Sequence, residues 1–269
     1  MEITTHVVGP RSSDHTHTII LLHGRDSIAS EFADEFFESQ ASDGRTAPDI
    51  FPAIKWVFPS SQLRTSARFE TKMSQWFDTW SVEDPSEKEE LQIAGLRESI
   101  GRILSIVRSE ALLVPPERII LGGISQGCAT AIHVLVCGGI RLGGFIGFSS
   151  WLPFQSRMQA IAECSKSNVL QYTRAIFSGD SNEARLQRDL SDISRESALQ
   201  TPIFLSHSQD DNVVPIKNGR GLYKTLESLG FMVTWKDYQD GGHWINEPQG
   251  VDDMVTFLHD EVVQGRARD

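Results

Sequence analysis

A serine that can act as a nucleophile stands in the pentapeptide 123–127, Gly-Ile-Ser-Gln-Gly. The pentapeptide follows the apolar run 118–121 and precedes an apolar helical pattern at 128–136, which predicts a strand, a tight turn and a helix. On such a turn the Ser125 hydroxyl stands clear of the sheet, and small residues are needed where strand and helix approach closely. The backbone N–H of Gln126, at the start of the helix, would face an oxyanion. The pattern predicts a nucleophile, against the alternative of a glycine-rich turn with an incidental serine.

A general base must accept the proton of this serine, and His243 is the best candidate among the eight histidines. It lies in a glycine-rich loop directly after the apolar run 233–238. His23 directly follows the apolar run 18–22, and we expect it to shape the loop that supplies a second oxyanion donor. We expect His207 to be structural.

A carboxylate must orient the base, and the loop after the run 203–205 offers Asp210 and Asp211. Asp180 follows another strand-like run and competes with them. The order serine, acid, histidine, with each residue after a predicted strand, is the order of the α/β-hydrolases. Because the carboxyl ends of parallel strands meet at one edge of a sheet, we expect the three side chains to lie close together.

Other reactive residues give weaker signals. His15 and His17 form an H-x-H pair without an evident third ligand, so we predict no metal site. Cys128 lies one helical turn beyond Ser125, and we predict a small residue packed on the sheet rather than a reactive thiol. The glycines at 138–144 lack the spacing of a phosphate-binding loop. We therefore expect chemistry without a cofactor.

Short apolar runs bounded by turn residues alternate with helical patterns along the whole chain. Such runs are typical of buried parallel strands. The alternation predicts an α/β fold with a mostly parallel central sheet and helices on both faces. The predicted strands are 18–22, 54–58, 118–121, 144–148, 203–205 and 233–238, and the predicted helices include 91–107, 128–136, 222–229 and 251–258.

The segment 155–200 is longer than a connection between two strands requires. It carries two helical patterns with apolar faces. We predict a single domain, 1–269, in which this segment is a helical cap or lid over the site. The alternative is that both helices pack as ordinary core. The candidate residues of the lid face are Met158, Ile161, Leu186, Leu190 and Ile193.

Composition restricts the partners of the protein. The 269 residues carry a net charge of −11, which disfavours nucleic acid and anionic lipid surfaces. The longest apolar stretch is interrupted by polar residues and glycines, so we expect no integral membrane segment. Three cysteines without a C-x-x-C motif, together with no apolar leader, predict a cytoplasmic protein.

A set of motifs in this order resembles the acyl-protein thioesterases, in the phospholipase/carboxylesterase branch of the α/β-hydrolases. The motifs are I-L-L-H-G at 20–24, S-Q-W-F-D at 74–78, R-I-I-L-G-G-I-S-Q-G at 118–127, S-S-W-L-P at 149–153, D-N-V-V-P at 211–215 and G-H at 242–243. The resemblance implies an α/β-hydrolase fold and a triad of Ser125, His243 and Asp211. It favours Asp211 over Asp210, because the family's acid stands four residues before the proline.

The resemblance also implies the residues around the triad. It places the oxyanion donors at the backbone N–H groups of Gln126 and Arg25, and substrate-binding side chains at Trp76, Trp151 and Leu152. The family usually has H-G-L-G-D where this chain has the shorter H-G-R-D at 23–26. Arg25 is therefore assigned by position, and its charge is expected to alter the mouth of the pocket.

The sequence thus predicts a cofactor-independent serine hydrolase that cleaves thioesters or carboxylic esters through an acyl-enzyme. Its substrate is an acyl ester or thioester, either small or bound to a protein or a carrier. One alternative is a trans-acting thioesterase that releases an acyl or polyketide chain from a carrier protein, and another is a small-ester carboxylesterase. A third alternative, a catalytically inactive hydrolase fold that serves as a binding module, is disfavoured by the ordered triad.

Overall fold

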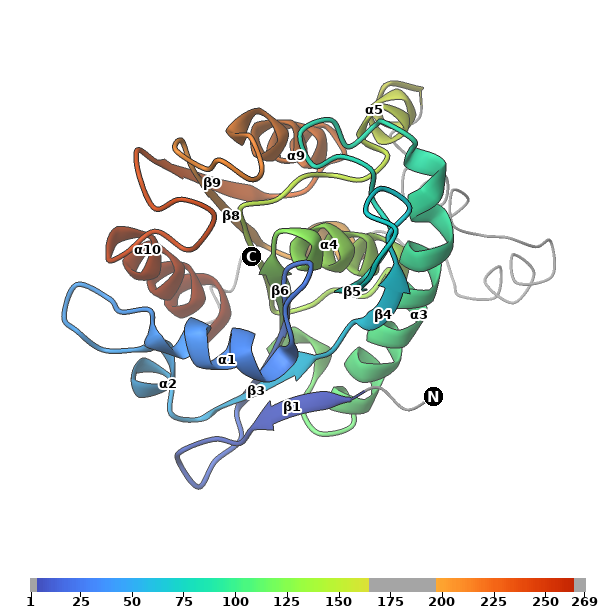
Figure 1. Ribbon diagram of the computed structural model, residues 1–269. Coiled ribbons are helices and arrows are strands. Elements are labelled where there is room, and N and C mark those ends of the chain that lie inside the picture. Colours follow the sequence, from blue (N-terminus) through green and yellow to red (C-terminus); the bar gives the residue numbers. More distant parts are fainter. Residues whose placement is uncertain (1–3, 165–196, 264–269) are drawn as a thin grey trace.

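A computed structural model describes residues 4–164 and 197–263 (Figure 1). Its centre is a seven-stranded sheet in the order β1-β3-β2-β6-β7-β8-β9. β1 runs antiparallel to β3, and the other neighbours are parallel. The strands are β1 (Thr5–Val8), β2 (His17–Leu22), β3 (Ile54–Pro59), β6 (Ile119–Ile124), β7 (Gly144–Phe148), β8 (Ile203–Ser208) and β9 (Val233–Tyr238), and a separate hairpin joins β4 (Gln62–Thr65) to β5 (Lys72–Gln75).

Helices cover both faces of the sheet, with α1 and α10 on one side and α3 and α4 on the other (Figure 1). The α/β-hydrolase architecture predicted from the sequence is confirmed. The helices are α1 (Ala29–Glu38), α2 (Ala47–Ile50), α3 (Gln92–Glu110), α4 (Gln126–Gly138), α5 (Gln155–Cys164), α9 (Ile216–Ser228) and α10 (Gln249–Phe257), with short helical turns η1 (Glu89–Leu91), η2 (Pro116–Arg118), η4 (Ser197–Gln200) and η5 (Leu258–Val263).

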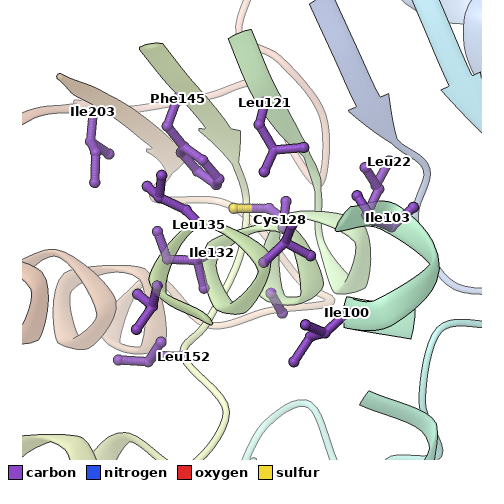
Figure 2. Packing of buried hydrophobic residues seen from close by; sticks show 14 of the residues in the cluster. Leu22, Ile100, Ile103, Leu121, Cys128, Ile132, Leu135, Phe145, Leu152 and Ile203 are labelled. Atoms are coloured by element: carbon purple, nitrogen blue, oxygen red, sulfur yellow. The ribbon is translucent and has the colours of Figure 1, made fainter. Parts of the chain in front are cut away.

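The core forms two apolar layers because side chains alternate across each buried strand. In β6, Ile119 and Leu121 face the layer beneath α3 and α4, whereas Ile120 and Ile124 face the layer beneath α1 and α10. Figure 2 shows the first layer, in which α4 packs under the sheet with α3 beside it. This packing fixes α4, and with it the turn that carries Ser125.

Two predicted strands, 144–148 and 233–238, have the observed bounds, while others differ at their ends. β8 continues beyond Leu205 through Ser206, His207 and Ser208, which are polar yet almost fully buried. The edge strand β1, the hairpin β4–β5 and helix α1 were not predicted. The residues of β1 and β4 are half-buried or exposed, and neither strand has the continuous apolar run that is typical of a central strand.

The first helix of the segment 155–200 belongs to the core. In α5, Met158 is fully buried in the main apolar cluster and Ile161 packs against it. Gln159 Nε2 donates to Thr225 Oγ1 of α9 at 3.1 Å. Met158 and Ile161 therefore pack as the core alternative expects. Leu186, Leu190, Ile193 and Asp180 lie outside the described residues, so a lid built from that part stays a prediction.

No helix in the described ranges combines the length and the apolar content that crossing a bilayer requires.

Candidate active site

Ser125 occupies the sharp turn between β6 and α4, with φ 54° and ψ −126°. A positive φ is unfavourable for a residue with a side chain, so this turn stores strain that the surrounding packing must offset. The Ser125 N–H donates to the carbonyl of Phe148 at 2.9 Å, and Ser150 Oγ donates to the carbonyl of Ser125 at 2.8 Å. The predicted strand–turn–helix around Ser125 is present in the structure.

The glycines that flank this turn are required by close backbone approach. A Cβ on Gly123 would lie 2.4 Å from the carbonyl oxygen of Leu22, and a Cβ on Gly127 would lie 2.2 Å from the same oxygen. Both distances are far inside van der Waals contact. The small residues two positions before and after Ser125 therefore allow α4 to start directly above β2 and β6.

His243 and Asp211 form a hydrogen-bonded pair. The His243 Nδ1–H donates to Asp211 Oδ2 at 2.8 Å. Asp210 has another partner, because its Oδ1 accepts the N–H of Gly242 at 2.9 Å. Asp211 thus touches the histidine, while Asp210 holds the loop that carries it. In the neutral ring this bond places the proton on Nδ1, so Nε2 is the nitrogen that can accept a proton.

The Asp211 carboxylate is buried and accepts several hydrogen bonds. Its Oδ1 accepts the N–H groups of Val213 and Val214 at 2.8 and 2.9 Å, and its Oδ2 also lies 3.1 Å from Nε2 of His207. Burial by itself raises the pKa of Asp211, but the hydrogen bonds from His207, His243 and Val214 outweigh it and hold the pKa well below its usual range. The carboxylate is therefore ionised at neutral pH.

Ser125 and His243 line one cavity of about 190 Å³. Its walls include aromatic and aliphatic side chains, which suit an acyl chain. Trp151 lines this cavity as predicted, whereas Leu152 lines a neighbouring cavity of about 170 Å³ that shares the Trp151 wall. The apolar lining residues are Phe32, Val82, Ile124, Trp151, Val213 and Trp244.

Trp76 is not a wall of this cavity, which corrects the prediction from the sequence. It is 2% exposed, and its indole Nε1–H donates to the carbonyl of His23 at 2.8 Å. Its backbone N–H donates to Gln126 Oε1 at 2.9 Å, and Gln126 Nε2 donates to the carbonyl of Phe77 at 2.8 Å. The W-F-D segment therefore supports the two candidate oxyanion donors from behind. A motif alone does not separate such a supporting residue from a lining residue.

The loop that carries Arg25 is held on both sides. His23 is fully buried, and its burial lowers its pKa to about 4, so the ring is neutral. Its Nδ1–H donates to the carbonyl of Gly24 at 2.6 Å, and its Nε2 accepts the N–H of Ser61 at 3.0 Å. The Asp26 N–H donates to the carbonyl of Ser74 at 2.7 Å.

Arg25 itself lines the cavity, as the sequence suggested. Its guanidinium lies 5.5 Å from the ring centre of Phe69, at the tip of the β4–β5 hairpin. Gln126 is the first residue of α4, and its backbone N–H has no partner inside the helix. Arg25 and Ser125 thus line the same cavity, and Gln126 directly follows Ser125.

Two other candidates are structural. Cys128 is fully buried, and burial raises its pKa to about 12, so it holds no reactive thiolate. His15 Nε2 faces the Thr18 hydroxyl at 2.9 Å. Throughout the part of the chain that the structure describes, no group of His, Cys, Asp or Glu side chains has the arrangement of a metal site.

Comparison with known proteins agrees with this geometry. The phospholipase/carboxylesterase family model matches residues 4–174, and the prolyl oligopeptidase family model matches residues 103–261. Acyl-protein thioesterase 1 of Yarrowia lipolytica is 31% identical over 94% of this chain and 95% of its own. The enzyme of the same name from Gibberella zeae is 25% identical over 95% of both chains. The crystal structure of Zea mays acyl-protein thioesterase 2 superposes with a TM-score of 0.69 at 24% identity, covering 96% of this chain and 99% of its own.

Proposed function

Because the chain belongs to the phospholipase/carboxylesterase family of α/β-hydrolases, we propose that Ser125, His243 and Asp211 are its catalytic triad. The relatives that match over nearly the full length are named thioesterases, which agrees with this family model rather than with the overlapping peptidase model. The protein is a serine hydrolase that acts on thioesters or carboxylic esters.

In the proposed mechanism, Ser125 Oγ attacks the acyl carbon while its proton passes to Nε2 of His243. Asp211 keeps the Nδ1–H tautomer of His243 in place and stabilises the imidazolium that forms. The N–H groups of Gln126 and Arg25 donate to the oxyanion. His243 then protonates the leaving thiol or alcohol, and an acyl ester remains on Ser125. A water molecule deprotonated by His243 attacks this ester, which releases the carboxylic acid and restores the serine hydroxyl.

The observation that carries the proposal is the contact between His243 and Asp211. A buried, ionised carboxylate at 2.8 Å from Nδ1 fixes the tautomer that a general base for Ser125 requires. His243 also lines the cavity that Ser125 lines, so the base and the nucleophile face the same space. A binding module without catalysis would not require this arrangement, so we propose an active enzyme.

We propose a protein-bound acyl thioester as the substrate, since the relatives are named for acyl-protein cleavage. The net charge of −11 disfavours an acidic carrier protein. The test compares kcat/KM on an S-acylated peptide, the same acyl group on a carrier protein, and a small acetyl ester. A higher value on the carrier or on the small ester would replace the proposed substrate.

Labelling by a fluorophosphonate probe separates an active hydrolase from an inactive one. The proposal expects the wild-type chain to be labelled at Ser125 and the Ser125→Ala variant to be neither labelled nor active. Turnover by a folded Ser125→Ala variant would refute the triad. The predicted cytoplasmic location is part of the same proposal and is checked by cell fractionation.

A further inference from the structure

Two imidazoles share one oxygen of the proposed catalytic acid. Asp211 Oδ2 lies 2.8 Å from Nδ1 of His243 and 3.1 Å from Nε2 of His207. Its Oδ1 is occupied by the N–H groups of Val213 and Val214. Backbone donors therefore hold one oxygen, and a second histidine approaches the oxygen that serves His243.

The proton of His207 is on Nε2. This nitrogen also lies 2.8 Å from the carbonyl oxygen of Val214, and because a carbonyl and a carboxylate both accept, an N–H must point between them. Nδ1 of the ring is buried, and no hydrogen-bond partner for it exists in the described part of the chain. A Cβ on Gly219 of α9 would lie 2.4 Å from this Nδ1. A second proton on the ring would thus meet helix backbone and no acceptor.

We propose that His207 is a positioning residue for the catalytic acid. As a neutral donor it fixes Oδ2 toward His243 and leaves the negative charge on Asp211 to stabilise the imidazolium of His243. A cation at this place would cancel part of that charge. Gly219 is part of the same arrangement, because only a residue without a side chain leaves room for the imidazole of His207. The inference rests on the proposed triad and extends it to Ser125, His243, Asp211 and His207.

Two substitutions at His207 separate the hydrogen bond from packing. His207→Phe keeps a ring of similar shape but removes the donor. In His207→Gln the amide nitrogen is as many bonds from Cα as Nε2 is, so a donor is restored. We expect the Phe variant to lose roughly 10- to 100-fold in kcat, with KM within about twofold of wild type, as for a lost hydrogen bond to a charged group. Labelling by the fluorophosphonate falls in parallel, and the Gln variant recovers most of the rate.

Gly219→Ala tests the position of the His207 ring while His207 itself is unchanged. This second variant keeps the test open if His207→Phe does not fold. Its new Cβ displaces the imidazole, and we expect a loss in kcat similar to that of His207→Phe. Gly221→Ala is the matched control on the same helix, because its Cβ meets only the flexible side chain of Gln155. We expect this control to keep the wild-type kcat.

The outcomes distinguish the inference from the function on which it rests. Equal losses in the Phe and Gln variants, a loss that is entirely in KM, or an unchanged kcat in folded Gly219→Ala would each overturn the role of His207. If Ser125→Ala, measured alongside, keeps full turnover, the triad itself is wrong. If Ser125→Ala is inactive while folded His207→Phe matches wild type, only the inference about His207 falls.

Discussion

Replacing Asp211 with asparagine is the sharpest test of the proposed site, because the structure dictates how the new amide must sit. Oδ1 of Asp211 accepts two backbone N–H groups, from Val213 and Val214. The asparagine keeps its carbonyl oxygen there, because the two backbone N–H groups would otherwise face an NH₂ donor. On the other side the His207 N–H keeps the carbonyl of Val214 as its acceptor, and the His243 ring can change its tautomer. Its NH₂ group then faces the Nδ1 of His243, where a carboxylate oxygen stood.

An NH₂ group at this place favours the wrong tautomer of His243. The imidazole must offer an unprotonated Nδ1 to the amide, which moves its proton to Nε2. In that state Nε2 cannot accept the proton of Ser125, and the charge that stabilises the imidazolium is also lost. We expect kcat to fall by roughly 10⁴-fold, the loss typical of this substitution in a serine triad. This corresponds to about 5 kcal/mol of transition-state stabilisation.

Asp210→Asn is the matched control one residue away. Its oxygen accepts a single N–H, from Gly242, and an asparagine oxygen can accept the same bond. We expect less than about tenfold loss in kcat. The assay is hydrolysis of a short acyl thioester at pH 7.5, with circular dichroism to confirm folding. Equal losses in the two variants, or a larger loss for Asp210→Asn, would transfer the role and refute the reasoning.

Three further predictions concern the nucleophile, the pH dependence of stability and a buried ion pair. Cys128→Ala should keep the activity within a few-fold while Ser125→Ala removes it, as measured by turnover and probe labelling; the reverse result would make Cys128 the nucleophile. Burial lowers the pKa of His23 to about 4 in the folded chain. Between about pH 6.5 and pH 4 the unfolded chain therefore binds a proton that the folded chain does not, so the free energy of unfolding should decrease as the pH falls through this range. His23→Asn should flatten this dependence in urea unfolding at pH 7 and 5, and an unchanged slope would contradict the buried neutral ring. Glu110→Ala leaves Lys55, now 2.7 Å from Glu110, without its partner and should lower the unfolding free energy by about 3 kcal/mol, with kcat unchanged; a double variant, Glu110→Ala with Lys55→Ala, that loses clearly more than Glu110→Ala alone would argue against a stranded charge.

The turn at Ser125 could be predicted because backbone geometry dictates its residues. The carbonyl of Leu22 excludes a side chain at both Gly123 and Gly127, so the requirement is visible in the sequence as two glycines. The choice between Asp210 and Asp211 has no such geometric signature, and in the sequence only the resemblance of D-N-V-V-P to the family motif favours Asp211. Two adjacent acids in one loop differ only in the direction of the side chain, which depends on the N–H groups around each of them.

The end of β8 could not be predicted for a related reason. Hydropathy ends the strand at Leu205, yet Ser206, His207 and Ser208 continue it in buried positions. Burial of His207 is supported by the two acceptors that its Nε2 finds in the loop that follows, the carbonyl of Val214 and Oδ2 of Asp211. From the sequence alone, His207 is expected to be structural. Its contact with Asp211 depends on the course of the loop between them.

The loop that carries Arg25 is held by residues that are distant in the sequence. Nε2 of His23 accepts the N–H of Ser61, and the N–H of Asp26 donates to the carbonyl of Ser74, so the residues on either side of Gly24 and Arg25 are both tethered. Burial keeps His23 neutral, which leaves its Nε2 able to accept this bond at neutral pH. A donor held between two fixed points loses little freedom when an oxyanion forms, which is what preorganised stabilisation requires. The residues that tether the loop lie between positions 61 and 76, so the oxyanion site that we propose would depend on the β4–β5 hairpin and the segment after it as well as on the H-G-R-D motif.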